Sequence, residues 1–160
     1  MAAPGGREMP AWVTRPLSDM PLLGPAESLS GVQRELQELL DRYAKGVEAA
    51  ELSEVEACMR TDEEFLSVES SYPNYGWADY DKNHLSLELG MLKDMEYKAE
   101  LVHAFGNGNL SYGVFVFTAS AERDGQRRTK QGMGTLVAEK MDGDWRIRHW
   151  TTCARRPPTT

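Results

Sequence analysis

The sequence predicts an α+β protein with the element order ααβαββββ, in which helices of the first half cover one face of an antiparallel sheet. Two observations carry this prediction. Between residues 28 and 91, apolar residues recur at three- and four-residue steps, as in amphipathic helices. From residue 95 onward, long segments suited to strands are separated by turn signals such as Asp124-Gly125 and Asp142-Gly143. Helices grouped before one antiparallel sheet are typical of the α+β class.

The composition narrows the class of protein further. The 160 residues carry 18 Lys and Arg against 25 Asp and Glu, a formal net charge of −7, and fit one domain. We therefore expect neither nucleic acid nor an anionic membrane surface as a partner. The sequence has no apolar run of the ~18 residues that a membrane span needs, and its start does not resemble a secretory signal, so we expect a cytoplasmic protein. Cys58 and Cys153 are too few for a disulfide framework.

Residues 1–27 are expected to form a proline-rich arm, residues 28–155 the domain, and residues 156–160 a tail. The arm holds five of the eight prolines, a composition that supports neither a helix nor a sheet. Two hypotheses remain open for it. It is either a loose arm, or one whose Trp12 and Leu22 pack on the domain or on a partner subunit.

Three helices and a short strand are expected in the first half. The first helix begins near Ser28 and carries an apolar stripe formed by Val32, Leu36, Leu39, Leu40, Tyr43 and Val47. A capping pattern at Ser53 and Glu56 opens a shorter helix. Residues 64–69 favour a strand, and residues 70–76 a loop. A third helix from Trp77 places one side-chain face along Trp77, Tyr80, His84, Leu87 and Met91.

Four strands complete the expected sheet, over residues 95–105, 110–121, 129–140 and 145–153. Asp124-Gly125 and Asp142-Gly143 form the hairpin turns, because glycine tolerates a positive φ. Gly132-Met133-Gly134 lies inside a strand and lacks the features of a phosphate-binding loop. We expect these glycines to let the sheet bend.

The closing string Gly132-Met133-Gly134-Thr135-Leu136-Val137, followed by Asp142-Gly143-Asp144-Trp145-Arg146-Ile147-Arg148-His149, resembles the SnoaL-like branch of the nuclear transport factor 2-like superfamily. Gly76-Trp77-Ala78-Asp79-Tyr80 supports the resemblance, which covers about residues 28–155. It implies a cone-shaped sheet that encloses a largely apolar pocket, and a homodimer formed through the sheet. It does not fix the function, because this fold hosts many activities.

The same resemblance implies two catalytic positions. In ketosteroid isomerase-like members, a carboxylate base ends the first strand and a tyrosine of the first helix polarises the substrate oxygen, which here implies Glu69 and Tyr43. An apolar pocket raises the pKa of a carboxyl group and suits it to acid–base work near neutral pH. A later-strand carboxyl group, expected near Gly132 or Gly134, is absent from the sequence, so steroid-type isomerisation is not expected. Alternatively, Tyr43 is a core residue and Glu69 is solvated or caps the strand.

Two histidines are further candidates for proton transfer. His84 shares its helical face with apolar residues, and His149 alternates with Trp145, Ile147 and Thr151, so we expect both to face the cavity, although a histidine on an apolar face can equally be a core residue. Candidates for the substrate-binding wall or mouth are Tyr72, Tyr75, Trp77, Tyr80, Phe115, Phe117 and Thr151. No metal site or cofactor is expected, because the histidines lack ligand spacing.

The leading hypothesis is cofactor-independent isomerisation, cyclisation, dehydration or hydrolysis of a small apolar or cyclic metabolite. The second hypothesis is a non-catalytic module that binds a ligand or dimerises, with Trp150 as an aromatic anchor on the outer sheet face. A metal-dependent oxygenase or sensor is a third.

Overall fold

The computed structural model describes residues 15–155, so the expected contact of Trp12 and the tail 156–160 lie outside the described residues. The helical elements are η1 (Leu17–Asp19), η2 (Ala26–Ser28), α2 (Gly31–Glu48), α3 (Leu52–Glu56), α4 (Trp77–Tyr80), a π-helical turn (Asp81–Leu85) and α5 (Ser86–Met91). The strands are β1 (Leu66–Glu69), β2 (Tyr72–Tyr75), β3 (Lys93–Asn107), β4 (Leu110–Arg123), β5 (Gln126–Met141) and β6 (Asp144–Arg155). The predicted α+β class is confirmed.

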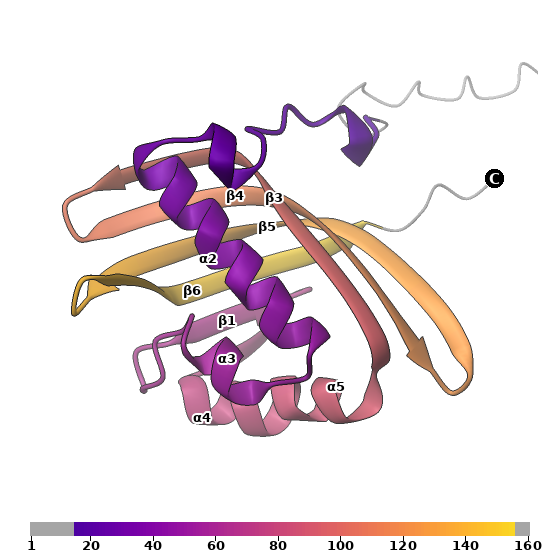
Figure 1. Cartoon of the computed structure of the whole chain (residues 1–160). Coiled ribbons are helices and arrows are strands. Elements are labelled where there is room, and N and C mark those ends of the chain that lie inside the picture. The colour runs from indigo at the N-terminus through magenta and orange to yellow at the C-terminus, as the bar shows by residue number, and fades with distance from the viewer. Residues whose placement is uncertain (1–14, 156–160) are drawn as a thin grey trace, which may run out of the picture.

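The six strands form one curved sheet that wraps around α2 (Figure 1). Their order is β2-β1-β6-β5-β4-β3, and all neighbours pair antiparallel except β1 and β6, which are parallel. The apolar stripe of α2 is buried against the concave face of the sheet, which makes this interface the hydrophobic core. Gln37 ties the helix to β3, because its side-chain amide donates to the carbonyl of Ala99 and accepts from the N–H of Leu101.

A two-strand hairpin stands where the sequence predicted one strand and a loop. Ser70 and Ser71 both have positive φ, 51° and 73°, as the central residues of a tight hairpin turn require. Serine is not a usual signal for this turn, which is why β2 was not predicted. Pro73 is tolerated because β2 is the edge strand of the sheet.

The third helix is interrupted rather than continuous. The π-helical turn over Asp81–Leu85 inserts an extra residue between α4 and α5 and rotates the following side chains. Leu85 is therefore buried, whereas Leu87 and Met91, which the sequence predicted on the inner face, are exposed. The prediction of one continuous helical face was wrong for this reason.

The glycines of β5 make room for aromatic side chains of β4. Phe115 pairs with Gly134 and Phe117 with Gly132, so each ring lies over a residue without a Cβ. A Cβ at Gly134 would overlap the Phe115 ring. The glycines thus let the sheet curve closely around its own aromatic core.

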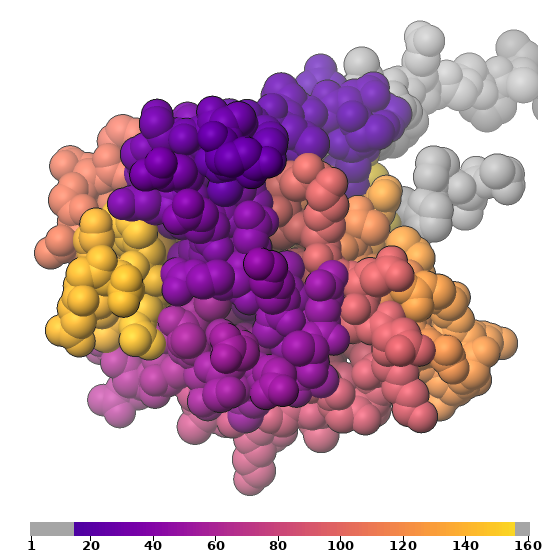
Figure 2. Space-filling model, viewed as in Figure 1, coloured from indigo at the N-terminus to yellow at the C-terminus, as the bar shows by residue number. Residues whose placement is uncertain are grey.

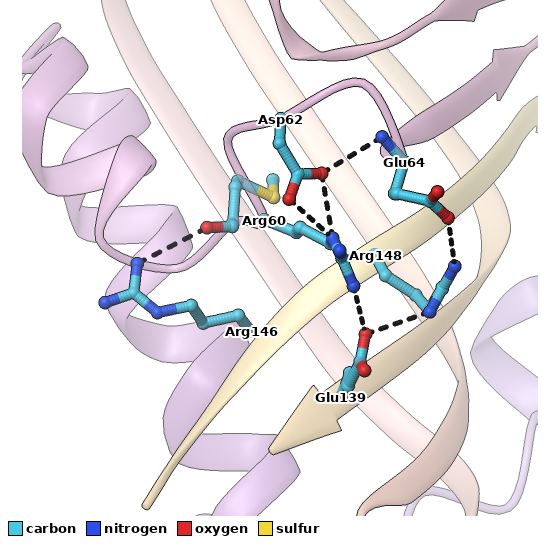
Figure 3. A network of polar contacts seen from close by, with 7 residues as sticks. Arg60, Asp62, Glu64, Glu139, Arg146 and Arg148 are labelled. Atoms are coloured by element: carbon cyan, nitrogen blue, oxygen red, sulfur yellow. Dashed lines mark hydrogen bonds and ion pairs between the residues drawn. The ribbon is translucent and has the colours of Figure 1, made fainter. Parts of the chain in front are cut away.

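A β-bulge in β6 moves Arg148 out of the regular pairing. Val137 pairs with His149 and Ala138 with Ile147, which leaves Arg148 without a partner residue on β5. Its guanidinium donates to Glu139, which also accepts from Arg60, and to Glu64 (Figure 3). Arg60 also pairs with Asp62. This network fastens the loop before β1 to strands β5 and β6.

The segment before α2 lies across one end of the molecule (Figure 2). Leu17 is buried, Leu22 is exposed, and the N–H of Leu23 donates to the carbonyl of Leu101 on β3. Among residues 15–155, no helix combines the length and the apolar character needed to cross a membrane.

Candidate functional site

A cavity of about 430 Å³ lies between the concave sheet face, the C-terminal half of α2 and α5. This volume is within the range of small-molecule sites, about 300–1,000 Å³. Its apolar wall is formed by Val47, Leu85, Leu89, Leu92, Met95, Phe117 and Trp150, with two tyrosines, Tyr43 and Tyr97, among them. Charged side chains also line it, namely Glu69, Glu88, Arg123, Arg128 and Lys130.

Glu69 reaches the cavity from the end of β1. The parallel pairing of Glu69 with Thr152 of β6 fixes its position, and both residues line the cavity. The Tyr80 hydroxyl donates to its Oε1 at 3.0 Å, and Nε2 of His84 donates to its Oε2 at 3.1 Å. The Glu69 side chain is 17% exposed, so the two donors compensate for much of the lost hydration of its carboxylate. Glu69 is thus held in one orientation in the wall of the cavity.

His84 is held as an imidazolium. Its Nδ1 lies 3.2 Å from Oδ1 of Asn74, and the amide of Asn74 is oriented by its own bond to Asp79. Both ring nitrogens therefore face oxygen acceptors, which requires two ring protons. The hydrogen-bonded ion pair with Glu69 and then the longer ion pair with Glu88 raise the pKa of His84 to about 10.

Glu88 is the second carboxylate in the cavity lining. Its Oε1 lies 3.6 Å from Nε2 of His84, at the i+4 position expected for a helical neighbour. Burial opposes the ionisation of Glu88, but the ion pair with His84 and the charge of Lys130 outweigh it and hold the pKa of Glu88 below the usual value. The carboxylate of Glu88 is therefore charged at neutral pH.

Tyr43 and Tyr97 place two phenols in the cavity wall. Burial raises the pKa of both, and the Coulombic effect of Glu69 acts in the same direction. Their rings meet edge to face at 5.5 Å, the ring of Tyr97 stacks on Phe117, and that of Tyr43 packs on Trp150 at 4.8 Å. Both hydroxyls remain protonated at neutral pH and can donate to a ligand oxygen.

The structure brings some of the predicted site residues together. Glu69, Tyr43 and Phe117 line the cavity. His84 and Tyr80 contact Glu69 without being part of the cavity lining. The phenol that bonds Glu69 is thus Tyr80 of α4.

The other predicted residues lie elsewhere. Trp77 and Phe115 are buried in the core, where Trp77 donates to Glu56 and Phe115 packs on Trp150. Tyr72 and Tyr75 are 76% and 73% exposed on the edge strand β2. None of these four lines the cavity.

His149 and Thr151 lie on the outer face of the sheet, opposite to the predicted face. The bulge at Arg148 breaks the two-residue alternation, so Trp145 and Ile147 point inward but the next inward residues are Trp150 and Thr152. His149 contacts the carbonyl of Leu66 through Nδ1 and the Thr151 hydroxyl through Nε2. The prediction that Trp150 anchors the outer face was wrong, because Trp150 is 1% exposed within the core.

Sequence reasoning missed several lining residues that a pattern could have indicated. Glu88 stands four residues after His84, the spacing of neighbours on a helix. Tyr97 lies two residues from both Met95 and Ala99 along β3, which is the spacing of residues on one face of a strand. Across residues 15–155, no group of three or more His, Cys, Asp or Glu side chains is placed to hold a metal ion.

No protein-family model matches the sequence, and no curated protein matches it. Several solved structures match the fold of this chain. A nuclear transport factor 2-like superfamily protein from Salmonella enterica serovar Typhimurium superposes with a TM-score of 0.72 at 19% identity, covering 80% of this chain and 94% of that one. A candidate aromatic ring hydroxylase from Novosphingobium aromaticivorans gives 0.68 at 15% identity, over 79% and 90% of the two chains. A candidate dehydratase of the same fold family from Streptomyces avermitilis gives 0.67 at 8% identity, over 77% and 95%.

The chain therefore has the nuclear transport factor 2-like fold, as its sequence predicted. Identities of 8–19% establish the fold and leave the activity to be argued from the site.

Proposed function

We propose that this protein performs acid–base chemistry without a redox cofactor on a small apolar or cyclic metabolite bound in the cavity. The observation that carries the proposal is the carboxylate of Glu69, which lines the cavity while Tyr80 and His84 hold both of its oxygens. A fixed carboxylate beside an apolar space meets the geometric demand on a general base.

The proposed reaction starts at a C–H bond adjacent to a substrate carbonyl. Glu69 takes the proton, the C–H electron pair forms a C=C bond, and the carbonyl oxygen gains negative charge. Tyr43 or Tyr97 donates a hydrogen bond to that oxygen, because both phenols stay protonated beside the same cavity. Return of the proton from Glu69 to another carbon gives isomerisation. Transfer of that proton to a β-hydroxyl group, whose C–O bond then breaks to release water, gives dehydration. Neither outcome needs an oxidant.

His84 acts in this proposal as a positioning residue. With its pKa near 10 it remains cationic at neutral pH, and it bonds the oxygen of Glu69 that Tyr80 does not. We assign His149 no part in the reaction, because it lies on the outer face of the sheet.

Solvent-deuterium exchange detects the proposed proton transfer whichever product the reaction forms. The purified protein is incubated in D₂O with a panel of cyclic ketones and β-hydroxy acids, and mass spectrometry follows deuterium incorporation. We expect the wild-type protein to exchange deuterium into at least one panel member. The exchange rate should fall by about 10²-fold or more in Glu69→Gln. The control variant Glu100→Gln, on β3, should keep the wild-type exchange rate. Full exchange in Glu69→Gln overturns the assignment of the base.

A second candidate is a non-catalytic ligand-binding protein of the same fold. One observation favours it, namely that both oxygens of Glu69 and both ring nitrogens of His84 already have protein partners. Ligand extracted from the purified protein and identified by mass spectrometry discriminates the two. A ligand that is bound and released unchanged, with no exchange of its C–H protons, favours the binding protein.

We also propose that the protein forms a homodimer through the outer face of the sheet. The side chains of Val114, Val116, Met133, Thr135 and Val137 alternate outward on β4 and β5 and are half-buried, which supports an apolar docking face. Light scattering after size-exclusion chromatography tests this, with Val116→Lys expected to give a monomer. A wild-type monomer at all concentrations overturns the proposal.

A further inference from the structure

We propose that the cavity binds an apolar compound carrying one anionic oxygen group, and that Lys130 and Arg128 at its mouth recognise that group. This inference rests on the proposed function, because it names the class of compound that enters the same cavity. The structural observation is a set of cations on the β4–β5 hairpin, Arg123, Arg128 and Lys130, in a protein whose net charge is −7.

The strand register places these cations on the concave face. Lys130 pairs with Ala119 and Arg128 with Ala121, and directly paired residues of antiparallel strands share a face. The two alanines continue the inward alternation of Phe115 and Phe117 along β4, and they are buried. The basic side chains therefore extend from the same face as the aromatic core, towards the tip of the hairpin.

The surroundings leave the two cations available for a ligand. Within residues 15–155, neither Arg128 nor Lys130 makes a side-chain ion pair or hydrogen bond, whereas the neighbouring Arg127 pairs with Glu96 at 3.0 Å. Arg123 lies 3.7 Å from Asp124 in an exposed pair, which is a weak interaction. Ala119 and Ala121, opposite Lys130 and Arg128, line the same cavity.

The order of side chains along the hairpin gives the ligand a direction. From the interior outward, the concave face presents Phe117, then Lys130 with Ala119, then Arg128 with Ala121. In Figure 1 this hairpin curves towards the side of the molecule where α5 lies. An apolar body can thus lie against Phe117, Tyr97 and Trp150 while its acidic group meets Lys130 and Arg128.

The acidic residues of the cavity favour a singly charged group. Glu69 and Glu88 also line the cavity, and Lys130 is close enough to Glu88 to help lower its pKa. A doubly charged phosphate would be repelled by the two carboxylates of the cavity. The single charge of a carboxylate or sulfonate can be balanced by the cations at the mouth alone. Arginine also suits planar carboxylates, because it can donate two parallel hydrogen bonds.

Matched probes test this inference. Binding of 2-naphthoate and of its neutral analogue 2-naphthamide is measured by isothermal titration calorimetry at pH 7 and low salt. We expect the wild-type protein to prefer the acid by about tenfold, and 0.5 M NaCl to reduce the preference, because salt screens exposed charges. The double variant Arg128→Gln/Lys130→Gln is expected to bind both probes equally. Arg127→Gln, which changes the adjacent residue on the opposite strand face, is the control and is expected to keep the preference.

The outcomes separate this inference from the function on which it rests. Equal binding of the two probes by the wild type, or an unchanged preference in the double variant, overturns anion recognition and leaves a ligand-binding cavity. Absence of binding by both probes overturns the ligand-binding cavity as well. Binding of the acid with loss of the preference in the double variant supports both.

Discussion

The hydroxyl of Tyr80 lies 3.0 Å from Oε1 of Glu69 and donates to it, which joins the first turn after the β1–β2 hairpin to the end of β1. Both residues precede the long strands β3 to β6 in the chain. Yet Glu69 reaches the cavity because β1 pairs in parallel with β6, the last strand. The site is therefore completed by contacts between the first and the last strands of the chain, which are neighbours in the sheet.

Removal of the Tyr80 hydroxyl is expected to destabilise the protein while leaving its core packing intact. In Tyr80→Phe the ring keeps its contacts with Phe65 and Trp77, but Glu69 loses one donor. A hydrogen bond to a charged group contributes about 1.5–3 kcal/mol, and we expect a loss at the lower end of this range in urea unfolding. Tyr75→Phe, at an exposed position, serves as control and is expected to change nothing. An unaltered unfolding midpoint in Tyr80→Phe contradicts the prediction.

His84 is expected to make stability depend on pH between about 6.5 and 10. Its bonds to Glu69 and Glu88 raise the pKa of the folded state to about 10 from the ordinary 6.5, so the folded protein binds the proton more tightly than the unfolded chain. The stabilisation is fully present below pH 6.5 and is lost as the pH rises towards 10. Urea midpoints measured across this range should fall in the wild type and change much less in His84→Gln.

His103 offers the matched control for that experiment. It lies on β3 and bonds the hydroxyl of Tyr112 at an exposed position. His103→Gln should therefore retain the wild-type decrease in the urea midpoint. The assignment to His84 fails if His84→Gln retains the same decrease.

The contribution of α2 to the site could be predicted because the signal of this helix is local. The stripe of α2 repeats every three or four residues, so the burial of Leu36, Leu40 and Tyr43 follows from the sequence. Glu69 could be placed at a strand end for the same reason. Its contacts with Tyr80 and His84 could not be predicted, because Tyr80 precedes and His84 lies within a π-helical turn whose extra residue leaves no mark in the apolar pattern.

The positions that failed in α5 and in β6 depend on insertions of one residue. The bulge at Arg148 exchanges the faces of His149 and Trp150, and a two-residue period cannot indicate where such a bulge falls. The positions of the cations at the mouth of the cavity could, in contrast, be predicted from the sequence. The Asp124-Gly125 turn fixes the β4–β5 register, and that register alone sets Lys130 opposite Ala119.

Gly134 is expected to be intolerant of any side chain. A Cβ at this position would overlap the ring of Phe115, which is fully buried and also packs on Trp150, so the ring cannot move aside. Overpacking of a core costs about 1–3 kcal/mol, and Gly134→Ala should lower the melting temperature accordingly. Gly90 lies in α5 with no neighbouring atom near its Cβ position. Gly90→Ala should be neutral or stabilising, and a similar loss in both variants would contradict the argument from close packing.

The last prediction concerns Glu139, which accepts from Arg60 at 2.6 Å and from Arg148 at 2.9 Å. Glu139→Gln keeps the shape of the side chain but removes the charge that both guanidinium groups share, and it leaves two cations close together. We expect a lower urea midpoint at low ionic strength, with a smaller difference from the wild type at 1 M NaCl, because salt screens the remaining repulsion. Glu122→Gln, near the tip of the β4–β5 hairpin, is the control. A difference that is independent of salt would show that Glu139 acts through packing rather than through its charge.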